Sequence, residues 1–247
     1  MAFDFDAARI ESLPTDAFYI SDFISEDEEA RLIYKVQSAP LPHWTHLSHR
    51  RLQSWPSTLT KSDTLLASPL PSWLADPVMD RFNDLGVFTD APHGAPNHVL
   101  VNEYHPGQGI LPHEDGPAYY PLVATVSLGA PIVLDLYEKN THSPRNDHRL
   151  SENVQHPATP RFRILQERRS LLIMQKSIYT DFLHGIAEVS TDKDLGSHSI
   201  CNWNLLREQN TYCAGWYPRE TRTSITYRDV LKVAKMGDTL KFLGRAS

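Results

Sequence analysis

The feature that most constrains the fold is a series of short apolar runs between residues 98 and 230. They are HVLVNEY (98–104), LVATVSLG (122–129), PIVLDLYE (131–138), RFRILQ (161–166), RSLLIMQ (169–175) and TRTSITYRDV (221–230). Most are rich in β-branched or aromatic residues and are bounded by glycine, proline or polar residues, which is typical of strands. Several short strands joined by tight turns predict a β-sandwich or barrel.

Two helices are expected ahead of these strands. The segment 21–39 has Ser25 as a candidate N-cap, acidic residues in the first turn and apolar residues at helical spacing. A second helix is expected near 77–85. The polar segments 139–160 and 190–218 lack such patterns and are expected to be surface insertions.

Composition limits the class of protein. A chain of 247 residues with 40% hydrophobic content can bury one sizeable core, so a single domain spanning 1–247 is expected. A net charge of −6 argues against binding nucleic acid by bulk electrostatics, although a local basic patch could still hold phosphates. Two cysteines, Cys201 and Cys213, are too few for a disulfide framework. With no apolar run near membrane length and no signal-peptide pattern, a soluble intracellular protein is expected.

A candidate metal site begins at LPHEDGP (111–117). His113 and Asp115 stand two residues apart, so on an extended backbone both side chains point to one face and can share a metal ion. The same spacing also occurs in ordinary turns. A facial triad needs a second histidine from another strand, and His184 in TDFLHGIAEV is the candidate. The alternative for His184 is a hydrogen-bonded core histidine.

A candidate anion site lies on the segment TRTSITYR (221–228). Arg222, Ser224, Thr226 and Arg228 alternate with other residues, so a strand would place them on one face. Such a face is costly to bury unless an anion neutralises it, and a guanidinium suits the carboxylate of a dicarboxylic cosubstrate. The alternative is an exposed edge strand.

A further pair, Asn102 and Tyr104, stands on the strand that precedes His113. Both side chains could add hydrogen bonds to the same ligand. Either could equally belong to the end of a strand.

Taken in order, these motifs resemble the AlkB family of Fe(II)- and 2-oxoglutarate-dependent dioxygenases. The motifs are Asn102-x-Tyr104, HPGQGILPHEDGP with His113-x-Asp115, LHG with His184, and Arg222 six residues before Arg228. The segments NHVLVNEYHPGQGILPHEDGPAYYPLVATVSLG and RRLQSW resemble one eukaryotic branch in particular. The resemblance covers nearly the whole chain, and the ordered set is more specific than any single motif.

The resemblance implies a mainly β fold with flanking helices, whose core is a double-stranded β-helix (a cupin-like jelly-roll). Residues 1–95 would give N-terminal helices and a substrate lid, and residues 96–235 the jelly-roll with the two insertions. It also implies ligand sets: Fe(II) bound by His113, Asp115 and His184, and 2-oxoglutarate bound by Asn102, Tyr104 and Arg222, with Arg228, Ser224 and Thr226 in the same pocket.

The implied reaction is oxidative demethylation of alkylated DNA or RNA, which consumes O2 and releases formaldehyde, succinate and CO2. A lid is expected at HWTHLSHRRLQSWPS (43–57), because tryptophan can stack on a base and arginines can hold phosphates. The candidate substrate residues are Arg50, Arg51, Trp55, Tyr119 and Tyr120. The alternatives are core packing for the tryptophan and a structural cap of the barrel for the tyrosines.

Three functions therefore stay open at the level of sequence. The first is a demethylase acting on nucleic acid with methylated bases, as a monomer in cytoplasm and nucleus and without a membrane partner. The second is a protein or small-molecule hydroxylase or demethylase, which the net charge of −6 also permits. The third is a non-catalytic reader of modified nucleic acid. A zinc hydrolase gives no role to Arg222 and Arg228 and is the least favoured.

Overall fold

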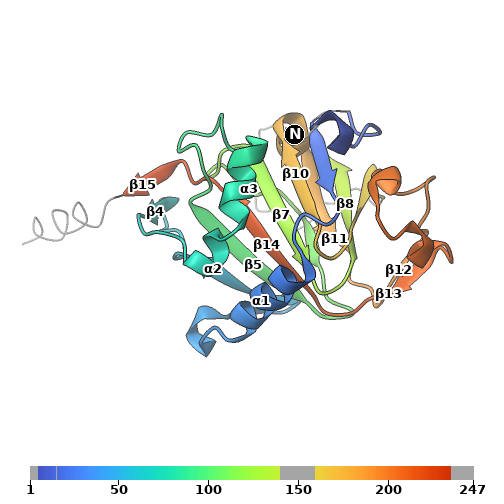
Figure 1. Ribbon diagram of the computed structural model, residues 1–247, viewed down its shortest axis with the longest axis horizontal. Coiled ribbons are helices and arrows are strands. Elements are labelled where there is room, and N and C mark those ends of the chain that lie inside the picture. Colours follow the sequence, from blue (N-terminus) through green and yellow to red (C-terminus); the bar gives the residue numbers. More distant parts are fainter. Residues whose placement is uncertain (1–4, 15, 140–158, 235–247) are drawn as a thin grey trace, which may run out of the picture.

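Two β-sheets face each other at the centre of the computed structural model, which describes residues 5–14, 16–139 and 159–234 (Figure 1). The large sheet has the order β1 (Ala17–Ile20), β10 (Leu171–Gln175), β7 (Leu122–Leu128), β14 (Arg222–Arg228), β5 (His98–Tyr104), β3 (Arg50–Trp55) and β2 (Thr45–Leu47). The small sheet has the order β6 (Ile110–His113), β11 (Phe182–Ile186), β8 (Ile132–Glu138) and β9 (Phe162–Gln166).

All neighbouring strands within these two sheets are antiparallel. Two smaller pairs join β12 (Thr191–Lys193) to β13 (Trp216–Pro218), and β4 (Thr64–Leu66) to β15 (Lys232–Ala234). The expected jelly-roll is confirmed, and its two sheets enclose an interior into which both strand sets direct side chains.

The six strands expected from the apolar runs all form, with ends within two residues of the predicted ones. Their alternation explains how the interior is made. On β14, Ile225 and Tyr227 belong to the apolar core between the large sheet and the helices. The arginine and hydroxyl residues at the alternate positions line the cavity between the two sheets. All seven β14 residues are buried, so the alternative of an exposed edge strand is wrong.

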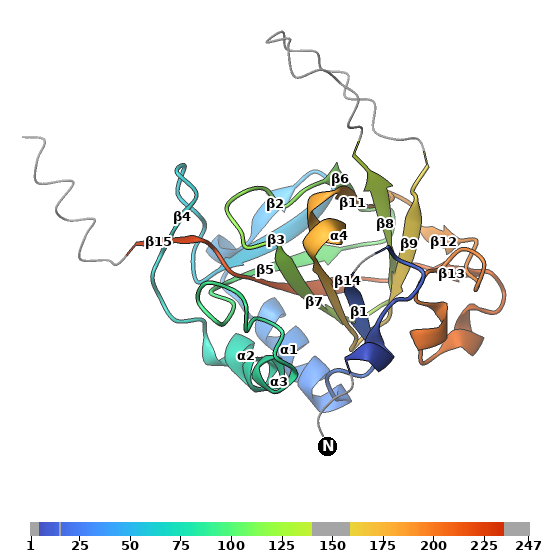
Figure 2. The same cartoon turned by 90° about the horizontal axis from the view of Figure 1, so that it is seen from above.

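Helices cover the outer face of the large sheet (Figure 2). They are α1 (Glu26–Gln37), α2 (Ser72–Ala75) and α3 (Val78–Leu85). Ser25 caps α1 through a capping box, in which its side chain accepts from the Glu28 N–H and the Glu28 carboxylate accepts from the Ser25 N–H. Leu32, Val36 and Phe82 then pack onto the sheet. Both predicted helices are confirmed.

The N-terminal region contributes more to the sheet than the sequence suggested. β1, β2 and β3 all belong to the large sheet, beside the short 3-10 turns η1 (Asp6–Ala8) and η2 (Leu41–His43). The segment 43–57, expected to be a separate lid, is a β2–β3 hairpin that extends this sheet past β5. The alternating pattern that would have revealed these strands is interrupted by polar residues on both faces.

The segment 190–218, expected to be a surface insertion without regular structure, is ordered and partly buried. It contains β12, η3 (Trp203–Leu205), η4 (Gln209–Tyr212) and β13, and its buried residues pack against the outer face of the small sheet. The buried Asn202 side chain accepts from the Leu165 N–H at 2.9 Å and donates to the Leu165 carbonyl oxygen at 2.8 Å. A sparse set of apolar residues, Leu195, Ile200, Leu206 and Tyr212, provides this packing.

The other expected insertion, 139–160, lies outside the described residues except at its two ends. A short helix, α4 (Lys176–Thr180), separates β10 from β11. Among the described helices, none is long and apolar enough to cross a membrane.

Candidate functional site

Two strands and one loop bring together the three candidate metal ligands. His113 at the end of β6 pairs directly with His184 on β11, and their rings lie 4.3 Å apart between centroids. Asp115 follows β6 by two residues, and its Oδ1 lies 3.8 Å from His184 Nε2. One potential ligand atom from each residue lies within 4.8 Å of the others. This is the donor set of a two-histidine, one-carboxylate facial triad.

The protonation of these groups suits metal binding. Burial lowers the pKa of His113, and it lowers the pKa of His184 to about 4. Both imidazoles are therefore neutral near pH 7 and have a lone pair to offer. His113 Nδ1 donates to the Leu111 carbonyl oxygen at 2.9 Å, which leaves its Nε2 free to bind a metal.

Arg228 holds the carboxylate of the triad. Its Nε and Nη2 donate to Asp115 Oδ2 and Oδ1 at 3.1 and 2.5 Å. Burial by itself would raise the pKa of Asp115, but the charge of Arg228 and its hydrogen bonds outweigh burial, with a further contribution from the nearby histidines, and the pKa stays below its usual value. The carboxylate is therefore ionised and fixed in orientation. Arg228 thus binds a triad residue, and it also lines the cavity in which the resemblance places it.

Arg222 is the unpaired cation of the pocket. Its side chain is buried, and its Nη2 donates to Ser127 Oγ at 2.9 Å and to Gln166 Oε1 at 3.1 Å. It has no carboxylate partner among the described residues, and its Nε has no hydrogen-bond partner there. Burial lowers its pKa to about 10, so the guanidinium remains charged at neutral pH. A buried charge without a counterion is costly, which makes this an anion-binding position.

The remaining residues predicted to bind 2-oxoglutarate line the same cavity. Asn102 and Tyr104 enter it from β5, and Ser224 and Thr226 enter it from β14. Apolar side chains from β6, β7, β8, β10 and β11 form most of the remaining wall. A metal-binding triad at one part of the cavity and a cationic, hydroxyl-rich part beside it fit a metal ion together with a dicarboxylate.

Three predicted substrate residues lie elsewhere. Arg51 donates to the buried Glu103 at 2.6 Å and lies over the Trp44 ring, 4.0 Å from its centroid. Trp55 stacks on His43 and contacts Trp73 of α2, so it packs between helix and sheet. Both side chains alternate with Arg50 and therefore face the helices, away from the cavity.

Tyr120 is the third correction. Its ring packs against the core beneath the large sheet and lines a separate cleft with Phe18 and Leu122. The residue before it, Tyr119, is placed differently. The Tyr119 ring lies 5.0 Å from the Arg228 guanidinium carbon, next to the triad. Arg50 also remains beside the cavity, since its Nε donates to Asn102 Oδ1 at 3.2 Å.

Sequence reasoning missed three residues of the site. Ser127 and Gln166 hold Arg222 in place, and Tyr179 on α4 lies near the Asp115–Arg228 pair. Ser127 sits in an apolar run two residues from Thr125, so its place on a predicted strand was the available signal. Gln166 ends the predicted strand 161–166 and has the same signal, whereas Tyr179 lies outside the predicted strands and has none.

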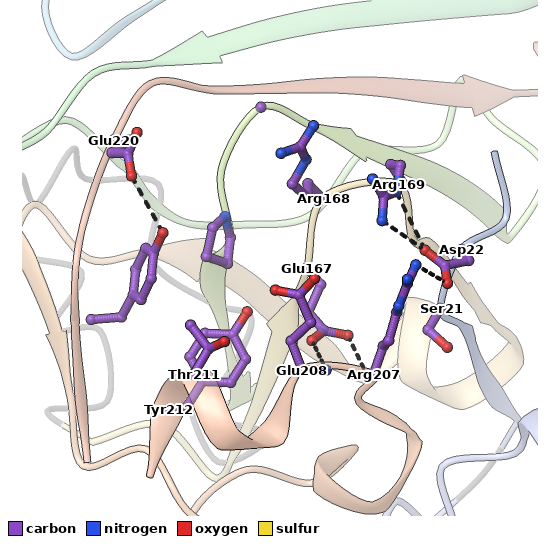
Figure 3. A pocket seen from close by; sticks show the side chains of 13 residues that line it. Ser21, Asp22, Glu167, Arg168, Arg169, Arg207, Glu208, Thr211, Tyr212 and Glu220 are labelled. Atoms are coloured by element: carbon purple, nitrogen blue, oxygen red, sulfur yellow. Dashed lines mark hydrogen bonds and ion pairs between the residues drawn. The ribbon is translucent and has the colours of Figure 1, made fainter. Parts of the chain in front are cut away.

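A second pocket, outside the sheets, contains more arginines than the first (Figure 3). It lies between the β9–β10 turn and the segment 207–220, and its arginines are Arg168, Arg169 and Arg207. Figure 3 shows Arg169 and Arg207 sharing Asp22. Arg168 is bound by the buried Glu29. Because each arginine already has a carboxylate, this pocket offers no free charge for a ligand.

Comparison with known proteins gives consistent relatives. The family model of the 2OG-Fe(II) oxygenase superfamily matches residues 58–228. A Danio rerio protein named "Probable RNA/DNA demethylase ALKBH6" is 37% identical over 242 residues, which cover 98% of this chain and 96% of that protein. The Xenopus tropicalis "tRNA (carboxymethyluridine(34)-5-O)-methyltransferase alkbh8" is 26% identical over 89% of this chain but only 32% of its own length. Among solved structures, OsALKBH1 superposes with a TM-score of 0.55 at 15% identity, covering 88% of this chain and 98% of that one, which is a likeness of fold.

Proposed function

The chain belongs to the 2OG-Fe(II) oxygenase superfamily and, within it, to the AlkB family, and we propose that it oxidatively demethylates methylated bases in nucleic acid. The resemblance inferred from the ordered motifs, including the eukaryotic branch, is confirmed by the 37% identical relative. The enzyme is a dioxygenase that uses Fe(II), 2-oxoglutarate and O2.

The observation that carries the enzyme class is the buried Arg222, without a carboxylate partner in the described chain, next to a His–His–Asp triad. A metal hydrolase needs only the triad, whereas a 2-oxoglutarate enzyme also needs a cation for the far carboxylate of its cosubstrate. The two features in one cavity fit the second class.

In this cavity each residue has a role that its geometry supports. His113, Asp115 and His184 would hold the iron, and Arg228 orients the Asp115 carboxylate. Arg222 would pair with the distal carboxylate of 2-oxoglutarate, with hydroxyl and amide groups beside it. When bound, iron with 2-oxoglutarate and O2 supplies the oxidant that converts a methyl C–H to C–OH, while the cosubstrate becomes succinate and CO2.

The product chemistry explains demethylation. A hydroxymethyl group on a base nitrogen breaks its C–N bond, so that formaldehyde leaves and N–H remains. The share of the protein is to hold the methyl group at the metal and to exclude water from the apolar wall of the cavity.

The proposal of a nucleic-acid substrate has three supports. The Danio rerio relative bears the name of an RNA/DNA demethylase. Tyr119 offers an aromatic face beside the triad, where a flipped base could stack. Arg50, at the edge of the cavity, has no carboxylate partner among the described residues and could meet a phosphate.

The test is succinate release from 2-oxoglutarate by the iron-loaded protein, with and without pools of methylated DNA and RNA oligonucleotides. Formaldehyde is measured in parallel. One pool is expected to stimulate both products in a 1:1 ratio, and His113→Ala is expected to abolish both. His198→Ala is the matched control, since His198 is an exposed histidine paired with Asp194 and lies away from the cavity.

Stimulation by methylated peptides in place of oligonucleotides would contradict the proposed substrate while keeping the enzyme class. The monomeric state and the cytoplasmic and nuclear location stay predictions, to be checked by sedimentation and by imaging of the tagged protein.

A further inference from the structure

Four buried side-chain polar atoms in the described part of the chain have no hydrogen-bond partner. They are Ser57 Oγ, Asp135 Oδ1, Tyr179 OH and Arg222 Nε. Leaving a buried polar group unpaired is destabilising, so such atoms are uncommon and often belong to binding sites. Arg222 is explained by the cosubstrate. Tyr179 is a second unpaired group close to the same site, and the cosubstrate does not account for it.

The position of Tyr179 is fixed by the short helix α4. The helix follows β10 directly and precedes β11, the strand that carries His184. Its end is tied to the triad loop by Lys139, whose Nζ donates both to the Thr180 carbonyl oxygen and to Glu114 Oε2. Glu114 is the residue between His113 and Asp115. At its start, the Lys176 N–H donates to the Pro121 carbonyl oxygen at 3.2 Å. α4 therefore borders the triad on the side where Tyr119 lies.

The Tyr179 hydroxyl is buried without a partner in the described chain, and it lies within electrostatic range of the ionisable groups of the site. Burial raises its pKa well above the usual value, the negative charge of Asp115 adds to this effect, and the positive charge of Arg228 opposes it. The phenol is therefore protonated at working pH and has a hydrogen to donate. The Tyr119 ring contacts Arg228, the arginine that binds the Asp115 carboxylate.

We propose that Tyr179 is a specificity residue, which donates a hydrogen bond from its hydroxyl to an acceptor atom on the edge of the methylated base. This inference rests on the proposed function, since it assigns the contact to the nucleobase that enters the site. A ring nitrogen or a carbonyl oxygen of a base is the matching acceptor, and the Tyr119 ring gives the face on which that base stacks.

The assignment to the substrate follows from how the other ligands are held. The cosubstrate carboxylate has Arg222 on β14, and the metal has the triad. The Tyr179 hydroxyl is neutral and unpaired in the free protein. It is therefore better suited to bind a neutral acceptor than a phosphate, which is usually bound by arginine.

The experiment compares Tyr179→Phe with Tyr227→Phe. Tyr227 is also buried, but its hydroxyl donates to the Leu74 carbonyl oxygen at 2.8 Å and it faces the helices. Each variant is assayed for the oligonucleotide KM, with the oligonucleotide that stimulates the wild type, for the cosubstrate KM, and for Tm without ligands.

Tyr179→Phe is expected to raise the oligonucleotide KM about 3- to 10-fold, to leave the cosubstrate KM unchanged and to leave Tm equal or higher. Tyr227→Phe is expected to lower Tm and to leave both KM values unchanged. A base analogue that lacks the acceptor atom should weaken the wild type as much as the substitution does, with no further loss in Tyr179→Phe.

Two results overturn the inference while leaving the proposed function in place. One is an unchanged oligonucleotide KM in Tyr179→Phe, and the other is a rise in the cosubstrate KM alone, which would give the hydroxyl to 2-oxoglutarate. If no methylated oligonucleotide stimulates the wild type, the proposed function fails and the base contact fails with it.

Discussion

Two arginine-containing pockets in this protein differ in how their arginines are paired. In the outer pocket, Arg168 is bound by Glu29, Arg169 is bound by Asp22 and Glu26, and Arg207 is bound by Asp22. In the inner cavity, Arg228 is bound by Asp115, but Arg222 has only neutral partners within the described residues.

Of these two pockets, the larger is not the one that we propose as the ligand-binding site. The outer pocket has a volume of about 190 Å³, and the inner cavity has about 70 Å³. Pairing is the better guide, because a satisfied ion pair must be broken before a ligand can use it, whereas an unpaired buried cation gains from any anion that fits. The comparison assigns ligand binding to the inner cavity and a structural role to the outer arginines.

The largest expected effect comes from removing the unpaired arginine. Arg222→Met should lower kcat/KM for the cosubstrate about 100-fold or more, since losing a buried charged contact costs about 3 kcal/mol. Because the free protein then no longer buries an unpaired charge, its Tm should not fall. The measurements are succinate formation against cosubstrate concentration, and thermal unfolding with and without 2-oxoglutarate.

Added 2-oxoglutarate should raise the Tm of the wild type and not that of Arg222→Met, because only the protein that binds the ligand is stabilised by it. A variant that is still stabilised by the cosubstrate would show that Arg222 is not its anchor.

Changing the paired arginine of the same cavity should affect the metal. Arg228→Gln removes the two-pronged contact that orients Asp115, and the iron concentration for half-maximal succinate formation should rise about 10- to 100-fold. An iron titration at saturating 2-oxoglutarate measures it. If the iron dependence stays as in the wild type while the cosubstrate KM rises, then Arg228 acts on the cosubstrate and not on the metal ligand.

An arginine of the outer pocket should affect stability and not catalysis. Arg169→Met breaks ion pairs to Asp22 and Glu26, and it should lower the free energy of unfolding by about 1–2 kcal/mol, because both partners are well exposed. This corresponds to a fall in Tm of roughly 2–8 °C. The cosubstrate KM should stay as in the wild type, and a large rise would show that the outer pocket is coupled to the site.

The smallest expected effect is on the stability of the protein at acidic pH. Burial raises the pKa of Asp22, but hydrogen bonds from Arg207 and Arg169 outweigh it and hold the pKa below the usual 3.8. The ionised Asp22 carboxylate, bound to these two arginines, therefore adds stability above about pH 4. This contribution is lost as the pH falls through the lowered pKa. Asp22→Asn should remove a few tenths of a kcal/mol of acid-dependent stability, given the exposure of Asp22. Urea unfolding between about pH 3 and 6 tests this, and an identical pH profile in the variant would contradict it.

Much of the fold was readable from local pattern. The run 98–104 forms β5 with the predicted ends, and the expected first helix forms as α1 with Ser25 as its cap, because alternation and capping are properties of neighbouring residues. The ordered structure of the segment 190–218 was not predicted, for the opposite reason. Its apolar residues are too widely spaced to show a period, and their burial depends on the outer face of the small sheet.

The candidate site divides in the same way. The order of motifs was enough to select His113, Asp115, His184 and Arg222, since the ligand types and their sequence follow the family. Arg50 and Arg51 could not be separated, because adjacent polar residues give no sign of which face of a strand is inward. Pairing of β3 with β5 decides it: Arg50 reaches Asn102 and Arg51 reaches Glu103.

The sequence by itself determined the jelly-roll, the family, and the candidate residues for binding iron and 2-oxoglutarate. Only the tertiary structure decided that Arg228 serves Asp115, that Gln166 holds Arg222 across 56 residues of chain, and that Tyr179 is left without a partner in the described chain beside them. The physical reason is how far apart in the sequence the interacting residues lie. Strand period, helix capping and ligand type are set by residues close in sequence, whereas whether a buried polar group finds a partner depends on contacts that exist only after the two sheets have closed on each other.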